Sequence, residues 1–202
     1  EHGGVAGYPE FIGSGEGKNI FRQYLSTSVR GYTMLATPNS AVYPKWGAGL
    51  EIGTYFNLGL GKYISPAGYA YAYVYIPGFT PVQGIKLSVT HQQKLSSRSQ
   101  FGQTIVNILP RGLKDNTPLL SSMSVRNPSM TLVSIDYAAP VFIGNPVLGK
   151  NVFAIKRLVL TPSFDCTFIG KKAGLWSASL DAVIDFESIV TLVFPVSLGV
   201  TY

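Results

Sequence analysis

Charged side chains are scarce in this chain. Asp, Glu, Lys and Arg make up 13% of the 202 residues, about half of the roughly one quarter that is usual in soluble domains. Aromatic residues reach 12%, and the mean hydropathy is +0.23. So few charges are too little to cover the surface of a soluble domain. The composition favours a chain whose surface lies partly in lipid.

Long apolar runs are also missing. The longest uncharged stretch, residues 63–85, contains Pro66, Pro77 and Pro81. Proline disrupts the interior of a helix, and a helix that spans a membrane needs about 20 consecutive apolar residues. These features exclude a bundle of membrane helices, so the remaining interpretation is β-structure in lipid.

The residues of common reactive sites are few. Cys166 is the single cysteine, which excludes a disulfide framework or a four-ligand zinc site within the chain. Of the two histidines, only His91 is a candidate base, and it would need Ser or Asp within hydrogen-bond reach. We therefore expect no enzyme, no catalytic residues, no metal and no cofactor. The net charge of +6 comes from scattered Lys and Arg, so we also expect no nucleic-acid partner.

Apolar and polar residues alternate with a period of two in about eight segments, as expected for β-strands with two unlike faces. In residues 49–60, for example, Leu50 and Ile52 share one parity while Glu51 and Tyr55 share the other. Several segments are about 10 to 13 residues long, which matches a tilted strand that crosses a bilayer. The predicted strands are Phe21–Tyr32, Gly49–Leu60, Tyr69–Ile76, Ile85–Gln92, Met130–Tyr137, Leu158–Phe168, Leu175–Phe186 and Val190–Tyr202.

A soluble β-sandwich would alternate in the same way. Against it, the polar parity consists mostly of Ser, Thr, Gly and Tyr, where a soluble surface would carry Lys and Glu. Trp46, Phe79, Trp176 and Tyr202 also lie near strand ends, as in the aromatic girdles of outer-membrane proteins. The predicted fold is therefore an all-β transmembrane antiparallel barrel, with about eight strands in this chain.

Charged residues of the predicted strands fall on the parity opposite the apolar one, which would face the barrel lumen. They are Arg22, Arg30, Glu51, Lys86, Asp136, Asp165, Asp181 and Asp185. Both signs occur, so these side chains would either line a water-filled path or hold a loop inside the barrel, and we favour the loop.

Three segments lack the strand pattern. Residues 1–19 are expected to be irregular, and residues 20–202 to form the barrel strands with a long loop at 95–129. Residues 138–154 form another expected irregular excursion. In such barrels short turns lie on the periplasmic side, and long loops lie outside or fold into the lumen. The short links expected here are residues 59–65, 77–84, 170–174 and 187–188.

Several segments resemble known outer-membrane barrels. The segment Ile108-Leu109-Pro110-Arg111-Gly112-Leu113, followed by a strand at 131–137 and by Phe164-Asp165 on a further strand, resembles the C-terminal half of the bacterial surface antigen superfamily. This superfamily contains outer-membrane protein assembly factors and two-partner secretion transporters. Together with Tyr43-Pro44-Lys45-Trp46-Gly47, residues 75–79, 92–94, 152–158 and 194–202, it resembles a large barrel family of Bacteroidetes, often with an upstream propeller-like domain. The resemblance runs from about residue 20 to the end.

The resemblance implies that the strands belong to a larger barrel of about sixteen strands. It also implies that Arg111, at the tip of an Arg111-Gly112 loop folded into the barrel, contacts Asp165. The chain departs from the superfamily pattern at Leu113, usually an aromatic residue, and at Thr167, usually glycine.

Two functions are compatible with these features. The first is the handling of polypeptides by assembly, insertion or export, or the anchoring of an upstream periplasmic domain. The alternative is a passive transport pore for small solutes. Either way, we expect the protein in the bacterial outer membrane, in contact with lipid and with other outer-membrane or periplasmic proteins as further candidate partners.

Overall fold

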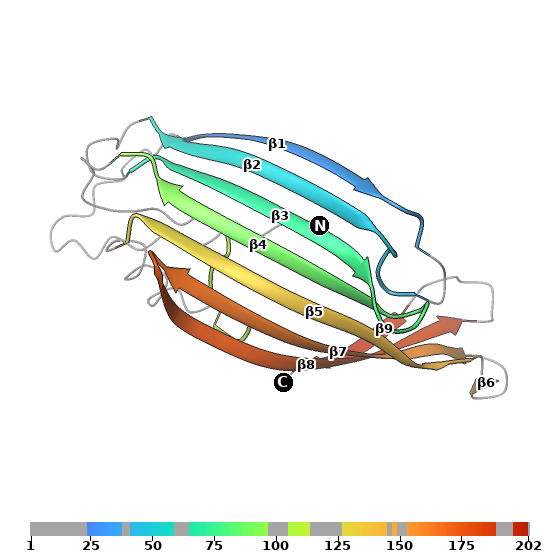
Figure 1. Ribbon diagram of the computed structural model, residues 1–202. Helices are drawn as coiled ribbons and strands as arrows, with labels where there is room; N and C mark the ends of the chain where they lie inside the picture. The colour runs from blue at the N-terminus through green and yellow to red at the C-terminus, as the bar shows by residue number, and fades with distance from the viewer. Residues whose placement is uncertain are drawn as a thin grey trace, which may run out of the picture.

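The computed structural model describes residues 24–37, 41–58, 65–96, 105–113, 127–144, 147–148, 153–188 and 196–201. These residues form one antiparallel sheet of nine strands, without a helix (Figure 1). The strands are β1 Tyr24–Met34, β2 Gly47–Asn57, β3 Ala67–Pro77, β4 Gly84–Lys94, β5 Ser129–Ile143, β6 Val147–Leu148, β7 Phe153–Ile169, β8 Lys172–Ser188 and β9 Val196–Thr201. Among the described residues, no helix is long and apolar enough to cross a membrane.

The strands of the main path pair in the order in which they follow one another along the chain, except that β5 pairs with β7 and not with β6. The order is β1-β2-β3-β4-β5-β7-β8-β9, and the two-residue β6 attaches to β7. Figure 1 shows these strands side by side in a curved sheet. Within the described residues, β1 pairs with β2 alone and β9 pairs with β8 alone.

The two parities of the strands form two unlike faces. The apolar face carries exposed large side chains on β1, β2, β4, β5, β7 and β8, which are Leu25, Val29, Leu50, Ile52, Phe56, Val89, Ile135, Phe164, Trp176 and Leu180. The register joins them into one surface, because Val29 lies opposite Ile52 and Ile135 lies opposite Phe164. The alternation predicted for β2 and β8 is therefore confirmed.

The opposite, polar face carries the charged residues. Arg30 lies opposite Glu51, Lys86 opposite Asp136, and Asp165 opposite Ser134. Asp181 and Asp185 share this face, opposite Thr161 and Arg157. Arg22 lies outside the described residues. The alternation predicted for these positions holds wherever the structure describes them.

Residues 138–154 correct one sequence expectation. Instead of an irregular excursion, β5 continues to Ile143 across a register shift between Pro140 and Phe142, and β7 already begins at Phe153. A bulge of this kind inserts an extra residue and breaks the period of two, which hid the extended strand. The predicted link at 187–188 is likewise wrong, since both residues belong to β8.

The sequence analysis expected the short links at one end of the strands and the long links at the other, and this expectation is also wrong. Consecutive strands are antiparallel, so the links alternate between the two ends of the sheet. The β2–β3 link and the two-residue β7–β8 turn therefore lie at the same end as the long β4–β5 link. At that turn, Gly170 has a φ of 62°, a left-handed conformation that favours glycine and suits a tight hairpin. Residues 1–19 and most of the 95–129 loop lie outside the described residues.

Candidate functional site

Residues 105–113 of the β4–β5 link pack against the polar face, and we call this segment the inserted turn. Ile108 and Leu109 are buried together with Met130 of β5. Val106, Leu113, Leu132, Ile169 and Leu175 surround this cluster. Met130, Leu132, Ile169 and Leu175 have the parity of the polar face, so apolar residues replace polar ones where the turn covers the sheet.

The tip of the inserted turn spans Pro110 to Leu113. The Leu113 N–H donates to the Pro110 carbonyl at 3.1 Å, which closes a four-residue turn. Gly112, the third residue, has a φ of 80°, as a type II turn requires at this position. Glycine adopts this φ without the steric cost that other residues incur. The turn leaves the Arg111 side chain directed at the sheet.

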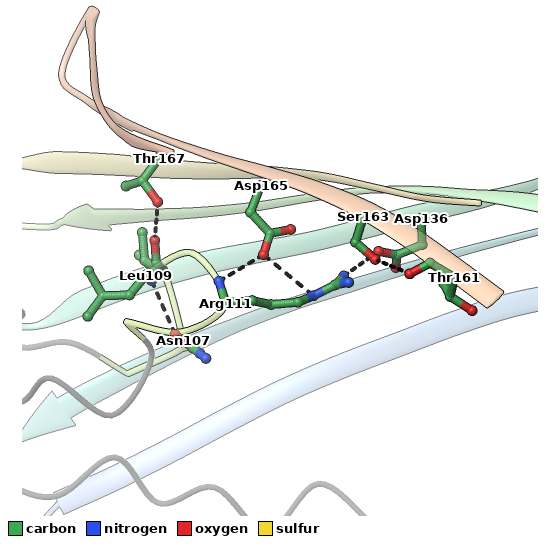
Figure 2. Close-up of polar contacts among 9 residues, drawn as sticks. Asn107, Leu109, Arg111, Asp136, Thr161, Ser163, Asp165 and Thr167 are labelled. Atoms are coloured by element: carbon green, nitrogen blue, oxygen red, sulfur yellow. Dashed lines mark hydrogen bonds and ion pairs between the residues drawn. The ribbon is translucent and has the colours of Figure 1, made fainter. Parts of the chain in front are cut away.

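Arg111 is bonded to two aspartates from neighbouring strands (Figure 2). Its backbone N–H donates to Asp165 Oδ2 at 2.8 Å, and its Nε lies 3.5 Å from the same oxygen. Its Nη2 pairs with Asp136 Oδ1. The two carboxylate side chains are 3% and 9% exposed, against 30% for Arg111. The guanidinium therefore supplies the counter-charge for two buried carboxylates.

The electrostatics of Arg111 follow from these neighbours. Burial lowers the pKa of its guanidinium, but the hydrogen bond and the charge of Asp136, together with the charges of Asp165 and Asp181, raise it above its ordinary value. The guanidinium therefore keeps its positive charge at neutral pH. One positive and two negative groups leave an excess of negative charge, and Asp165 Oδ1 is buried with no hydrogen-bond partner among the described residues.

Two further side chains of the sheet hold the backbone of the inserted turn. Thr167 of β7, which is fully buried, donates its hydroxyl to the Ile108 carbonyl at 2.5 Å. Gln92 of β4 accepts the Ile105 N–H at 2.7 Å through Oε1. Within the turn, Leu109 N–H donates to Asn107 Oδ1 at 3.1 Å. Side chains of β4, β5 and β7 thus fix one short segment.

Of the remaining candidate charges, Asp181 of β8 lies near enough to Arg111 for its charge to raise the pKa of the guanidinium. Arg30, Glu51, Lys86 and Asp185 have other partners. Arg30 pairs with Glu51, which also accepts the Tyr69 hydroxyl at 2.6 Å. Lys86 lies over the rings of Tyr73 and Tyr75, 5.9 Å from each centroid. Asp185 pairs with Arg157, a residue that the sequence analysis did not select because the predicted strand began one position later. Asp136 was expected to face inward, but its contact with Arg111 was not anticipated.

His91, the candidate base, lies with Val89 on the parity of the apolar face. Its Nδ1 is 2.8 Å from Thr131 Oγ1, and no hydrogen bond joins it to Ser or Asp among the described residues. Within the described ranges, no group of three or more His, Cys, Asp and Glu side chains is placed to hold a metal ion.

Comparison of the chain with models of protein families, with curated proteins and with solved structures gives no match. The architecture itself defines an all-β protein with one antiparallel sheet.

Proposed function

We propose that the chain forms part of an outer-membrane β-barrel that handles other polypeptides, by assembly, insertion or export, or that anchors an upstream periplasmic domain for this purpose. The observation that carries this proposal is the bonding of Arg111 to Asp165 and Asp136. An Arg-Gly turn that contacts an inward aspartate is what the resemblance to the bacterial surface antigen superfamily implies. No cofactor takes part in this function.

The apolar face supports the membrane placement. Large apolar side chains on six strands are exposed on one face of the sheet. Apolar area in water costs about 25 cal/mol per Å², and extended patches of this kind mark membrane or protein contacts. Lipid of the bacterial outer membrane would cover this face, with the polar face inside the barrel.

A passive pore is the weaker alternative. A pore needs a water-filled path along the polar face, whereas the inserted turn occupies part of that face and is bonded to β4, β5 and β7. A turn bonded to three strands is expected to stay fixed inside the barrel and to fill part of the path that a pore would need.

Replacement of Arg111 in cells tests the proposal. The full-length protein is depleted and replaced by the wild type, by Arg111→Gln or by Arg30→Gln, and the other proteins of the outer membrane are quantified by mass spectrometry. Arg30→Gln is the matched control, because it removes an exposed ion pair that contacts no inserted turn. We expect Arg111→Gln, at equal membrane level, to lower the amounts of other barrel or exported proteins. Unchanged amounts with a loss of small-solute uptake would contradict the proposal and favour the pore.

A further inference from the structure

A second segment lies over the polar face. Residues 41–46, which we call the strap, belong to the link between β1 and β2. Leu35 N–H donates to the Trp46 carbonyl at 3.0 Å, so the two strands stay paired up to the ends of this link. A hairpin needs only about two to five linking residues. The residues between Leu35 and Trp46 are therefore not required for the connection and are available for another role.

The middle of the strap sits on β3 and β4. The Tyr43 ring lies 5.3 Å from the Tyr75 ring, and a Cβ added to Gly84 would be 3.0 Å from Tyr43 Cβ. Gly84 is buried and begins β4. A contact of 3.0 Å between two Cβ atoms is tighter than usual, so the glycine at position 84 lets Tyr43 lie close against β4.

The start of the strap reaches β7. Arg157 Nη1 donates to the Ala41 carbonyl at 2.8 Å, while its Nε pairs with Asp185 of β8. In the sheet, β3, β4 and β5 separate β2 from β7, so the strap crosses three strands. Ala41 is 5% exposed. A charge-assisted pair fixes the direction of the guanidinium, which leaves its Nη1 aimed at the strap.

The strap and the inserted turn come from opposite ends of the strands, since the β1–β2 and β4–β5 links lie at different ends of the antiparallel sheet. We infer that residues 41–46 close the polar face at the end opposite the inserted turn, and that Arg157, oriented by Asp185, is the positioning residue that holds them there. Loss of this anchor opens that end. The anchoring of the strap does not depend on the proposed function. Its effect on passage through the barrel does.

Thiol labelling of the full-length protein in detergent tests the anchor. Ala41→Cys is made in a Cys166→Ser background and is labelled with a maleimide, with Arg157 intact, with Arg157→Gln, and with Arg30→Gln as the matched control. We expect Arg157→Gln to speed labelling by about tenfold or more, the effect of losing one charge-assisted contact, and Arg30→Gln to leave it unchanged. Rapid labelling with Arg157 intact, or an equal rate in all three proteins, would overturn the inference.

A disulfide provides a second test in case Arg157→Gln does not fold. In the Cys166→Ser background, Tyr43→Cys and Gly84→Cys place two Cβ atoms 3.0 Å apart, so a small shift brings them to the distance that a disulfide needs. We expect mild oxidation of this double variant to remove both thiols and to lower its mass by the two hydrogens lost. Persistent free thiols would show that the strap does not rest on β4.

The passage of ions through the barrel is measured last, as the conductance of the full-length protein in a planar bilayer. We expect higher conductance for Arg157→Gln, and lower conductance for the oxidised double variant than for its reduced form. Equal conductance in all forms would overturn the closing role. The labelling and disulfide results need neither conduction nor a client polypeptide, so their failure overturns the strap and leaves the proposed function standing. Conversely, unchanged protein amounts in cells with Arg111→Gln would remove the proposed function but not the strap.

Discussion

Arg111 and Asp165, 54 positions apart in the chain, are joined through both the backbone and the side chain of the arginine. Asp165 Oδ2 accepts the Arg111 backbone N–H at 2.8 Å and lies 3.5 Å from its Nε. The backbone bond does not depend on the side chain at position 111. Variants of the two residues should therefore differ in their effects on stability.

Arg111→Met should destabilise the fold more than Asp165→Asn. Loss of the arginine leaves two carboxylates, 3% and 9% exposed, without a cation, and breaking such a buried pair costs about 3 to 5 kcal/mol. Asparagine at 165 keeps an oxygen acceptor for the backbone N–H, and Asp136 still pairs with Arg111. Urea unfolding in detergent gives the free energies. The double variant should lose less than the sum of the single losses, and strict additivity would contradict the contact.

Gly112→Ala should destabilise the inserted turn. Alanine at a φ of 80° is strained, which costs roughly 1 kcal/mol or more. Gly31→Ala is the matched control, because its added Cβ meets no atom within 4 Å and its φ is not in the left-handed region. Proteolysis rates at the 105–113 segment report the difference. Equal rates for the two variants would show that the turn does not need its glycine.

Thr167→Val should weaken the hold of β7 on the inserted turn. Valine has nearly the shape of threonine but cannot donate to the Ile108 carbonyl. An unsatisfied buried group costs about 1 to 3 kcal/mol. Thr27→Val is the control, since its hydroxyl contacts Thr54 Oγ1 in an exposed pair. If both variants have the wild-type free energy of unfolding, the Thr167 contact contributes nothing to stability.

The strap should open at high pH. Burial, with the charge of Asp136 and contributions from Tyr75 and Asp181, raises the pKa of Tyr43 to about 12, although Arg111 opposes this shift. The ordinary pKa of a tyrosine is 10.0, so the seated strap favours the neutral phenol. Its stabilising effect is complete below pH 10 and is lost as the pH rises from 10 to about 12. Labelling of Ala41→Cys should accelerate in this range, after correction for the reactivity of the thiolate. In Tyr43→Phe the acceleration should disappear, and its persistence would assign the opening to another group.

The sequence predicts the two faces of β2 and β8 because burial on one side makes the period of two visible in the chain. Leu180 and Asp181 fall where the alternation places them. The contact between Arg111 and Asp165 came from a resemblance, and parity alone placed Asp165 on the polar face. The lumen and lipid assignments of these faces remain predictions.

Other features depend on contacts that no local pattern records. Arg157 was missed because a register shift between Ile155 and Arg157 interrupts the alternation at the start of β7. The strap was missed because residues 41–46 have no period, and their partners Gly84 and Arg157 are distant in the chain. The second aspartate of the site, Asp136, becomes a partner of Arg111 only through the pairing of β5 with β7.

The placement of the apolar face in lipid is the claim on which the proposed function depends, and quenching by brominated lipid tests it most directly. Single cysteines at 177, 178, 179 and 180 of β8, in a Cys166→Ser background of the full-length protein, are labelled with a fluorophore and reconstituted into vesicles with brominated acyl chains. Positions 178 and 180, where Ala178 and Leu180 are exposed on the apolar face, should be quenched strongly. Positions 177 and 179, on the polar face, should be quenched weakly. Equal quenching at all four positions, or stronger quenching at 177 and 179, would contradict the membrane placement.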